Sequence, residues 1–199
     1  VLTIVNTKKD ALALLDALND PGALHLSTLL CGAHRRAVIA EVKRRLNAGE
    51  ACRLVSTQVV EAGVDIDFPL VLRAIGPLDS VIQAAGRANR EGKLAGKGRV
   101  IIFDPAEGGS PRGSYHIAKE TTRTFLHDGP PDMDNPASVK RYFELYYPLD
   151  KTDRKGIQGL RAKLDYPEVD RLFRMIDDDT VSVVVEYEKE VGEIRLLVE

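Results

Sequence analysis

Two closely spaced arginines point to an anion site in the stretch SVIQAAGRANREG, residues 80–92. Gln83, Arg87 and Arg90 are spaced i, i+4 and i+7, which predicts that they share one face of a helix. Gly86 lies inside that predicted helix, where glycine costs about 1 kcal/mol relative to alanine but lets a ligand or another backbone approach closely. Neighbouring guanidinium groups repel one another unless an anion faces them. The pattern therefore predicts two arginines directed at a phosphate.

The same residues allow two simpler interpretations. Ser80 and Gln83 have the Ser-x-x-Gln spacing of a capping box, in which the glutamine serves only the start of the helix. Arg87 and Arg90 are also compatible with a solvated basic turn that forms salt bridges with Glu91 and its neighbours. This stretch alone does not decide between the alternatives.

A second polar cluster, STQVVEAGVDID, follows an apolar run that reads as a strand. Thr57 offers a hydroxyl and a backbone amide, and both groups are used to bind nucleic-acid phosphates. Gly63 permits an unusual turn. Asp65 is placed to accept a ribose hydroxyl or to pair with an arginine. The alternative is that Asp65 and Asp67 are only turn residues before Pro69.

The elements that must position these residues alternate between strand and helix patterns. Apolar runs predict strands at residues 1–7, 23–30, 51–56, 70–75 and 98–103. Thr7 and Asp10 have capping-box spacing before a helical pattern, and residues 34–46 predict a second helix with Val38, Ile39, Val42 and Leu46 inward. Repeated strand–helix units indicate a parallel sheet with helices on both faces. Ligands of such sheets sit beyond the carboxyl ends of the strands.

The character of the chain changes near residue 105. Residues 104–114 read as a loop or linker, because glycine, proline and serine dominate them. The following residues predict mainly helices, at 114–128, 135–147 and 166–176, and then a late strand at 180–187. The predicted fold is therefore α/β, with a parallel sheet flanked by helices and followed by a mainly helical C-terminal extension.

Together the two polar clusters resemble motifs V and VI of superfamily 2 helicases. Motif V of these enzymes has Thr, Gly and Asp at the spacing of Thr57, Gly63 and Asp65. Motif VI reads Gln-x-x-Gly-Arg-x-x-Arg, which the stretch from Gln83 to Arg90 matches. The opening residues VLTIVNT resemble motif IV, the entry strand of the second RecA-like lobe.

A longer stretch carries a more specific resemblance. VSTQVVEAGVDIDFPLVLRAIGPLDSVIQAAGRANREG is similar to the CRISPR-associated helicase–nuclease of type I interference systems. FRMIDDDTVSVVVEY, residues 173–187, resembles a segment that follows the helicase lobes in that family. The resemblance implies a RecA-like fold. We expect the second RecA-like lobe, with motifs IV, V and VI, at residues 1–108, and a linker with a C-terminal extension at residues 109–199.

The resemblance also implies roles for individual residues. Arg87 and Arg90 would reach the γ-phosphate of ATP held on the other lobe, and Arg90 would be the arginine finger. Gln83 would help to place the arginines and the attacking water. Asp65 would contact the nucleotide ribose or fix an arginine. Gly63 and Gly86 would also lie next to the bound nucleotide.

The resemblance implies partners as well. Thr57 would contact the DNA backbone and couple DNA binding to the state of the nucleotide. Further contacts with the DNA backbone are expected from Asn6, Thr7, Arg35 and Arg36. The expected partners are single-stranded DNA, the first RecA-like lobe and the HD nuclease domain of the same protein, and a CRISPR surveillance complex.

Parts of a complete motor are absent from these 199 residues. EGKLAGKGRV differs from a phosphate loop, because Glu91 stands where the first glycine belongs, Gly98 replaces Ser or Thr, and a strand follows. The sequence also has no Asp-Glu-x-Asp/His box. ATP and Mg²⁺ are therefore expected to be held mainly by the first lobe, and we expect the isolated chain to hydrolyse no ATP.

The sequence favours no metal site. A metal nuclease needs several clustered His and Asp ligands, and the chain has four histidines without a convincing partner set. His127 and Asp128 read as a helix end and turn. The acidic run at residues 177–179 reads as a solvated turn, with a metal site as the weaker alternative.

Composition limits the class of protein. The net charge of -2 does not itself predict nucleic-acid binding, so a DNA site requires a local basic patch. No apolar run approaches the roughly 18 residues of a membrane span. Two cysteines argue against a disulfide scaffold and favour the reducing cytoplasm. Two alternatives stay open: a superfamily 2 helicase of DNA repair or RNA remodelling, and a non-catalytic lobe that binds nucleic acid or a protein.

Overall fold

The computed structural model describes residues 1–61, 63–127, 129, 131–133, 135–150 and 153–173. The predicted strand at 180–187, the acidic run at 177–179 and Asp128 lie outside the described residues. So does most of the stretch 173–187 that carries the weaker family resemblance.

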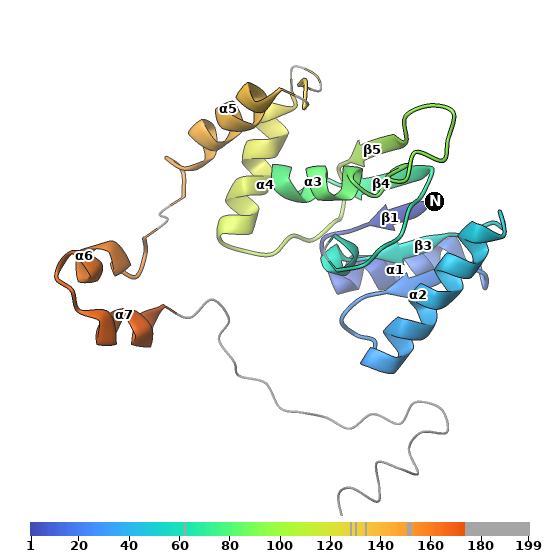
Figure 1. Cartoon of the computed structure of the whole chain (residues 1–199), viewed down its shortest axis with the longest axis horizontal. Coiled ribbons are helices and arrows are strands. Elements are labelled where there is room, and N and C mark those ends of the chain that lie inside the picture. The colour runs from blue at the N-terminus through green and yellow to red at the C-terminus, as the bar shows by residue number, and fades with distance from the viewer. Residues whose placement is uncertain (62, 128, 130, 134, 151–152, 174–199) are drawn as a thin grey trace, which may run out of the picture.

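Five parallel strands form the sheet, and the five strands predicted within residues 1–103 are confirmed (Figure 1). Their spatial order is β2-β3-β1-β4-β5. The strands are β1 (Leu2–Ile4), β2 (Leu24–Leu26), β3 (Leu54–Ser56), β4 (Leu70–Ala74) and β5 (Arg99–Phe103). The central strands are buried or half-buried along their length, as strands between helices must be.

Helix α1 (Lys8–Leu18) covers one face of the sheet. Its Ala11 packs in a buried cluster with Val5, Val55 and Ala74. The predicted start of the helix is confirmed, because the Thr7 hydroxyl accepts a hydrogen bond of 3.1 Å from the Asp10 amide. A cap of this kind contributes about 1 kcal/mol to helix stability.

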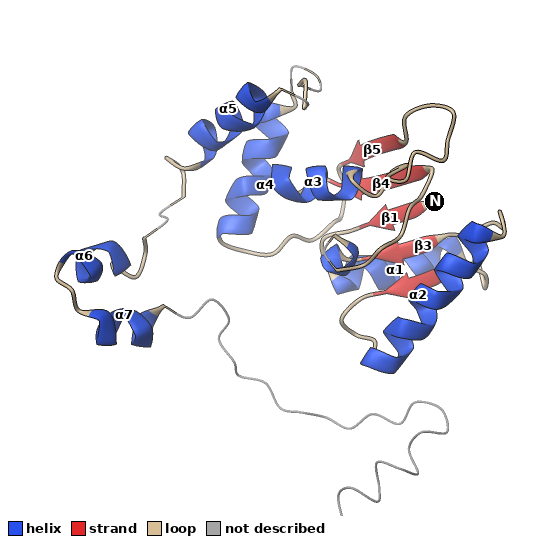
Figure 2. Ribbon diagram, in the orientation of Figure 1, coloured by secondary structure: helices blue, strands red, loops and turns tan. Residues whose placement is uncertain are grey.

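The opposite face packs against α2 (Gly32–Asn47) and α3 (Leu78–Ala85). Val38 and Val42 of α2 are buried, as the helical spacing predicts. They join the main core cluster together with residues of β1, β3 and β4. Figure 2 shows the resulting layers, with the sheet between helices.

A 3-10 turn at Gln58–Val60 follows β3. The second half of the described chain is helical, as predicted. Its helices are α4 (Ser114–Phe125), α5 (Pro136–Tyr146), α6 (Ile157–Ala162) and α7 (Tyr166–Leu172). Helix α6 was not predicted from the sequence. Helix α4 packs against α3 and α5 at the carboxyl ends of the strands, whereas α6 and α7 lie apart from the sheet (Figure 1).

Candidate functional site

The two arginines of motif VI lie on a turn rather than on a continuous helix, which corrects the prediction for residues 80–92. Helix α3 ends at Ala85 and Gly86 caps it. The backbone of Phe68 then pairs with the turn, because its N–H donates to the Arg87 carbonyl at 2.9 Å and its carbonyl accepts from the Asn89 amide at 3.0 Å. These long-range bonds replace the helical ones. We call residues 86–92 the arginine turn.

The capping-box interpretation of Ser80 and Gln83 is wrong. The residue that precedes the first turn of α3 is Pro77, and no side chain caps the helix there. Ser80 lies inside the helix and is buried. Gln83 is exposed and its side chain forms no hydrogen bond with the described residues, so its side-chain amide is available to a ligand or partner.

Arg87 and Arg90 point in different directions, so they do not form the shared face that the helical spacing predicted. Arg87 is 8% exposed, and its Nη2 donates to the carbonyl oxygen of Glu61 at 2.8 Å. Its Nε is buried without a partner among the described residues. Burial, with the nearby charge of Arg90, lowers the pKa of Arg87. Arg87 therefore ties motif VI to motif V inside the lobe.

Arg90 faces outward and pairs with Asp65. The distance from Arg90 Nη1 to Asp65 Oδ1 is 3.2 Å, and the two side chains are 52% and 68% exposed. A solvated pair of this kind is worth at most about 1 kcal/mol. Asp65 thus orients the guanidinium without holding it tightly. The alternative partner, Glu91, instead pairs its carboxylate with Lys93.

Asp67 fixes the arginine turn, a role that the sequence did not reveal. Its Oδ1 accepts from the Arg90 amide at 2.8 Å, and its Oδ2 accepts from the Glu91 amide at 3.1 Å. Asn89 adopts a positive φ of 52°, which asparagine tolerates better than most residues. The Asn89 side chain also bonds the backbone of Leu94 and Gly96. The backbone that carries Arg90 is therefore fixed although its side chain is free to move.

The two glycines of the motifs have different reasons to be glycine. Gly63 has a φ of 72°, which confirms the unusual turn predicted there. Gly86 has an ordinary φ of -64°, and a Cβ there would meet nothing closer than 3.4 Å. It is exposed, so its lack of a side chain leaves the surface of the arginine turn open to close approach.

Thr57 begins the segment that leaves β3 at the carboxyl edge of the sheet. Its backbone amide donates to the Leu26 carbonyl at 3.2 Å, so the expectation that this amide is free for a phosphate is wrong. The Thr57 hydroxyl forms no hydrogen bond with the described residues. The residue is 6% exposed. A ligand would contact this hydroxyl only if it lay directly against the carboxyl ends of β2 and β3.

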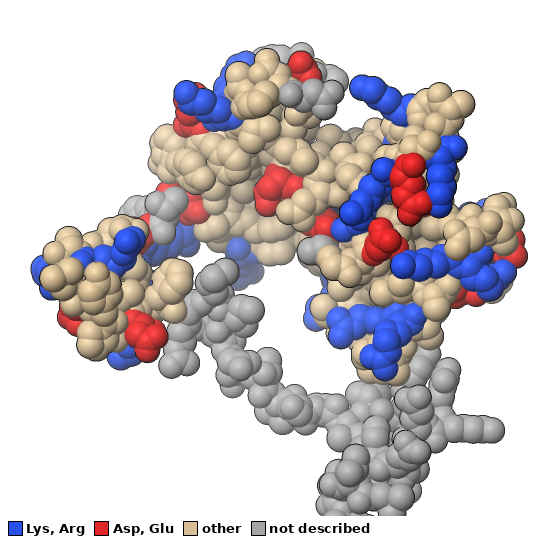
Figure 3. All heavy atoms as spheres, viewed as in Figure 1, with Lys and Arg blue, Asp and Glu red and all other residues tan. Residues whose placement is uncertain are grey.

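Arg35 and Arg36 lie in the first turns of α2, next to this edge. With Val59 and Val64 of the motif V segment they line a hollow of about 350 Å³, which we call the β2–β3 hollow. No side chain caps the start of α2, so its first amides add positive potential there. Figure 3 shows Lys and Arg side chains gathered over the first turns of α2.

The side chains of Asn6 and Thr7, which we expect to contact DNA, both form hydrogen bonds within the chain. Asn6 is 4% exposed, and its side-chain amide donates to the Ile75 carbonyl at 2.8 Å. Its Oδ1 accepts from Arg73 and from Tyr115, each at 2.8 Å. The Thr7 hydroxyl is engaged as the cap of α1. Both residues hold the carboxyl end of β1 in place.

Position in the sheet separates the two groups of candidate residues. Thr57, Arg35 and Arg36 lie near the carboxyl ends of β2 and β3, as expected of a ligand site. The arginine turn and Asp65 instead lie beside Phe68, ahead of the amino end of β4. The carboxyl ends of β1, β4 and β5 are covered by α4. The rule that ligands bind beyond the carboxyl ends of the strands therefore accounts for Thr57, Arg35 and Arg36, but not for the arginine turn and Asp65.

Comparison with known proteins identifies the first half of the chain. Residues 1–93 match the family model described as the C-terminal part of CRISPR-associated nuclease/helicase Cas3. The match covers 93 of the 199 residues. The matched residues include both motifs, from Thr57 to Arg90.

Curated Cas3 relatives extend the match. The chain is 34% identical over 111 residues to a CRISPR-associated nuclease/helicase Cas3 of Methanothermobacter thermautotrophicus, an alignment that covers 54% of this chain and 13% of that protein. It is 41% identical over 74 residues to the Cas3 of Haloferax volcanii, covering 36% of this chain and 8% of that one. The matches thus span only a small part of these relatives.

Solved Cas3 structures share the fold. The structure titled T. fusca Cas3-ATP has a TM-score of 0.60 at 20% identity, and covers 94% of this chain and 25% of that one. A chain in a CRISPR RNA-guided surveillance complex, pre-nicking, has a TM-score of 0.58 at 19% identity, and covers 89% of this chain and 25% of that one. At this identity the likeness establishes the RecA-like fold, as predicted.

The described residues contain neither a membrane-spanning helix nor a metal-binding cluster. No helix in this part of the chain is long and apolar enough to cross a membrane. No group of three or more His, Cys, Asp and Glu side chains among the same residues is arranged to hold a metal ion. Cys31 and Cys52 are free thiols.

Proposed function

We propose that this chain is the second motor lobe of an ATP-dependent helicase of the Cas3 kind, in which Arg90 serves as the arginine finger for ATP held by the first lobe. The observation that carries the proposal is the arginine turn. Its backbone is fixed by Asp67 and Phe68, while the Arg90 side chain is exposed and only weakly paired. The lobe is proposed to occupy residues 1–108, with residues 109–199 as a linker and extension.

The weak pair with Asp65 suits a group that must change partners. A γ-phosphate carries more charge than one carboxylate and accepts two parallel hydrogen bonds from a guanidinium. When the first lobe brings ATP to the turn, Arg90 exchanges Asp65 for the phosphate oxygens. A finger of this kind is worth about 10³–10⁵ in rate, because it stabilises charge on the phosphoryl group in the transition state.

The neighbouring residues have supporting roles in this proposal. Asp65, once released, is free to accept a ribose hydroxyl. Gln83 is exposed near the end of α3 and helps to orient the attacking water. Gly63 and Gly86 leave room for the nucleotide side of the cleft. Arg87 transmits the position of motif V to the turn through the Glu61 carbonyl, rather than contacting the phosphate in the arrangement described.

The residues present fit part of an ATP site only. ATP with Mg²⁺ supplies the phosphoryl group and most of the charge neutralisation. The chain has cations and amides to face a phosphate from one side, but no phosphate loop. Its own residues therefore orient Arg90 and close the cleft, and the nucleotide is held from the first lobe.

The DNA contacts are proposed at the β2–β3 hollow. Arg35, Arg36 and the Thr57 hydroxyl face the same edge of the sheet, and phosphate contacts by such groups give affinity without sequence preference. The substrate is single-stranded DNA. Asn6 and Thr7 are left out of the interface, because their polar groups already have partners.

The names of the relatives support a proposal for the wider assembly. The curated relatives are named nuclease/helicase, and one similar chain was solved in a CRISPR surveillance complex. We propose that the lobe works beside the first RecA-like lobe and an HD nuclease domain of the same protein, in CRISPR interference in the cytoplasm. Its motor would feed single-stranded DNA recruited by a surveillance complex to that nuclease.

The test is an Arg90→Ala variant of the full-length protein. We expect DNA-stimulated ATP hydrolysis to fall by about 10³-fold or more, with the affinity for ATP changed by less than about threefold. Arg53→Ala is a matched control, because Arg53 is also an exposed arginine paired with one aspartate, Asp20, at 2.6 Å. Equal turnover in the two variants would instead support a lobe that only binds nucleic acid.

A further inference from the structure

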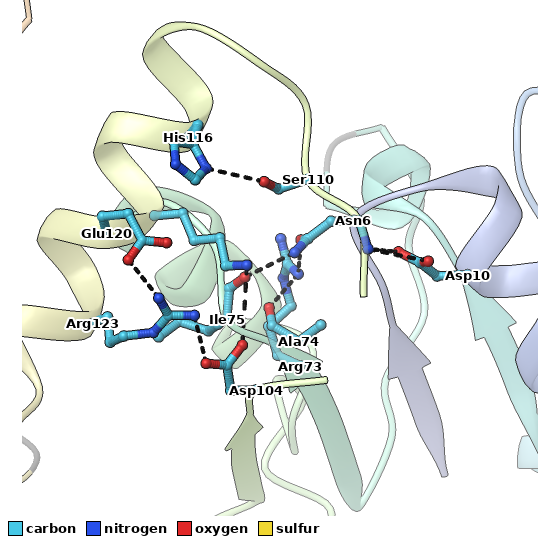
Figure 4. A network of polar contacts seen from close by, with 12 residues as sticks. Asn6, Asp10, Arg73, Ala74, Ile75, Asp104, Ser110, His116, Glu120 and Arg123 are labelled. Carbon is cyan, nitrogen blue, oxygen red and sulfur yellow. Dashed lines mark hydrogen bonds and ion pairs between the residues drawn. The ribbon is translucent and has the colours of Figure 1, made fainter. Parts of the chain in front are cut away.

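Helix α4 places one polar side chain directly on motif V. The Tyr115 hydroxyl donates to Asn6 Oδ1 at 2.8 Å and accepts from Gln58 Nε2 at 3.1 Å and from Arg73 Nη2 at 3.3 Å. Tyr115 lies beyond residues 1–93, which match the family model. Figure 4 shows Asn6 and Arg73 at the carboxyl ends of β1 and β4, facing α4.

The contacts continue from Tyr115 into both helicase motifs. Gln58 follows Thr57 directly, and its Nε2 also donates to the Asn6 carbonyl at 3.1 Å. Arg73 pairs with the Glu61 carboxylate at 3.0 Å. The Glu61 carbonyl in turn accepts from Arg87 at 2.8 Å. Residues 57–61 are thus held from α4 at one end and attached to the arginine turn at the other.

The network has little tolerance for rearrangement. Arg73 is fully buried, so its charge depends on the partners gathered around it. Gly76 marks the tight space, because a Cβ at this position would come within 2.9 Å of the Tyr115 hydroxyl and 3.0 Å of Arg73 Nη2. Removing the hydroxyl would leave a half-buried donor of Gln58 and a buried donor of Arg73 with one acceptor fewer.

We propose that Tyr115 is a positioning residue of the motor. Its hydroxyl fixes the position of residues 57–61 relative to the sheet and, through Glu61, the position of Arg87. The helical extension then controls how DNA binding is transmitted to the nucleotide side. The inference rests on the proposed function, since it assigns a regulator to that same site.

The docking of α4 does not depend on this hydroxyl alone. Arg123 of α4 donates to the Asp104 carboxylate at 2.5 Å, at the end of β5 (Figure 4). Tyr142 of α5 accepts from the Leu78 amide at 3.4 Å, at the start of α3. A Tyr115→Phe variant therefore keeps α4 in place and removes only the hydrogen bonds that its hydroxyl forms with Asn6, Gln58 and Arg73.

The experiment measures DNA-stimulated ATP hydrolysis by full-length Tyr115→Phe. We expect the DNA concentration for half-maximal stimulation to rise by about tenfold, as for loss of a hydroxyl whose partners are left under-satisfied. The KM for ATP should stay within about twofold. The control is Tyr147→Phe, because Tyr147 is 56% exposed on the same helical extension. A purely structural role would lower the melting temperature without this selective effect on DNA.

A double-mutant cycle with Thr57→Ala gives the second readout. If Tyr115 acts through motif V, the two substitutions are not additive, and Tyr115→Phe has less than about a third of its effect in the Thr57→Ala background. Full additivity overturns the proposal. If Tyr115→Phe does not fold, Gly76→Ala displaces the hydroxyl instead. The same DNA-selective defect is then expected, and normal DNA dependence overturns the proposal.

The two proposals fail in different ways. If Arg90→Ala and Thr57→Ala both leave DNA-stimulated turnover unchanged, the proposed function is wrong. If both abolish it and Tyr115→Phe behaves like Tyr147→Phe, only the positioning role of Tyr115 is wrong.

Discussion

Asp67 offers the sharpest test of how the arginine turn is built. Its two carboxylate oxygens accept the backbone amides of Arg90 and Glu91, at 2.8 and 3.1 Å. An Asp67→Ala substitution removes both bonds and touches no group that would meet the nucleotide. We expect turnover to fall, because Arg90 would lose its fixed backbone while keeping its charge.

The expected magnitude follows from the geometry. A side chain that accepts backbone amides in this way acts like a helix cap, whose loss costs about 1–2 kcal/mol. At about 1.4 kcal/mol per tenfold, 2 kcal/mol corresponds to roughly a 30-fold loss of the ordered turn. Phe68 still pairs with the backbone of Arg87 and Asn89, so part of the order survives. We therefore expect about a tenfold loss of kcat, and about threefold for Asp67→Asn, which keeps one acceptor oxygen.

The assay is steady-state, DNA-stimulated ATP hydrolysis by the full-length protein at saturating ATP and DNA. Asp16→Ala is a suitable control, because Asp16 is an exposed carboxylate of α1 without a side-chain hydrogen bond among the described residues. The explanation of the turn would be refuted if Asp67→Ala and Asp16→Ala both retained wild-type kcat. A loss of activity accompanied by loss of far-ultraviolet circular dichroism would show unfolding instead, and Asp67→Asn would then decide.

Two further predictions concern DNA and pH. Replacing both Arg35 and Arg36 by alanine should weaken single-stranded DNA binding by about tenfold. In a salt titration, the slope of log affinity against log salt concentration should fall in magnitude by about 1.4, because each lost phosphate contact removes about 0.7. Arg44→Ala, at the far end of the same helix, should behave like wild type. Burial, followed by the charge of His34, lowers the pKa of His25 below 6.5 in the folded chain. As the pH drops through about 6.5, the unfolded chain therefore binds a proton at His25 before the folded chain does, and the free energy of unfolding falls. Urea unfolding at pH 7.5 and 5.5 should show a smaller loss of stability for His25→Phe than for wild type, and equal losses would contradict this.

The sheet was predictable because its signals are local. Each strand is an apolar run between turn residues, and alternating helices dictate parallel order. The cap at Thr7 follows from residue types only three positions apart. The inward positions of α2 follow from helical period alone, as Val38 and Val42 show.

The site was harder to predict because long-range contacts decide it. Helical spacing continues beyond Ala85, but pairing with Phe68 ends the helix there. Asn6 has the residue type of a ligand contact, yet the register of β4 brings Arg73 to it and buries it. Asp67 read as a turn residue because its partners lie more than twenty positions away. An aspartate that follows a motif and precedes a strand is a signal worth testing for such a role.

The extension shows a third limit of sequence patterns. Its helices were predicted by type, except for α6, which is only six residues long. Nothing in the pattern of Tyr115 distinguished it from a surface tyrosine. Its importance arises from the packing of α4 over the carboxyl ends of the strands.

The central claim is that Arg90 supplies a guanidinium to a nucleotide held elsewhere. The most direct measurement is single-turnover ATP hydrolysis by full-length Arg90→Ala, with DNA saturating, with and without added guanidinium ion. We predict that the rate falls by about 10³-fold or more, that ATP binding persists, and that guanidinium restores part of the rate, since the Arg90 side chain is exposed. A wild-type rate in Arg90→Ala without added guanidinium would contradict the claim.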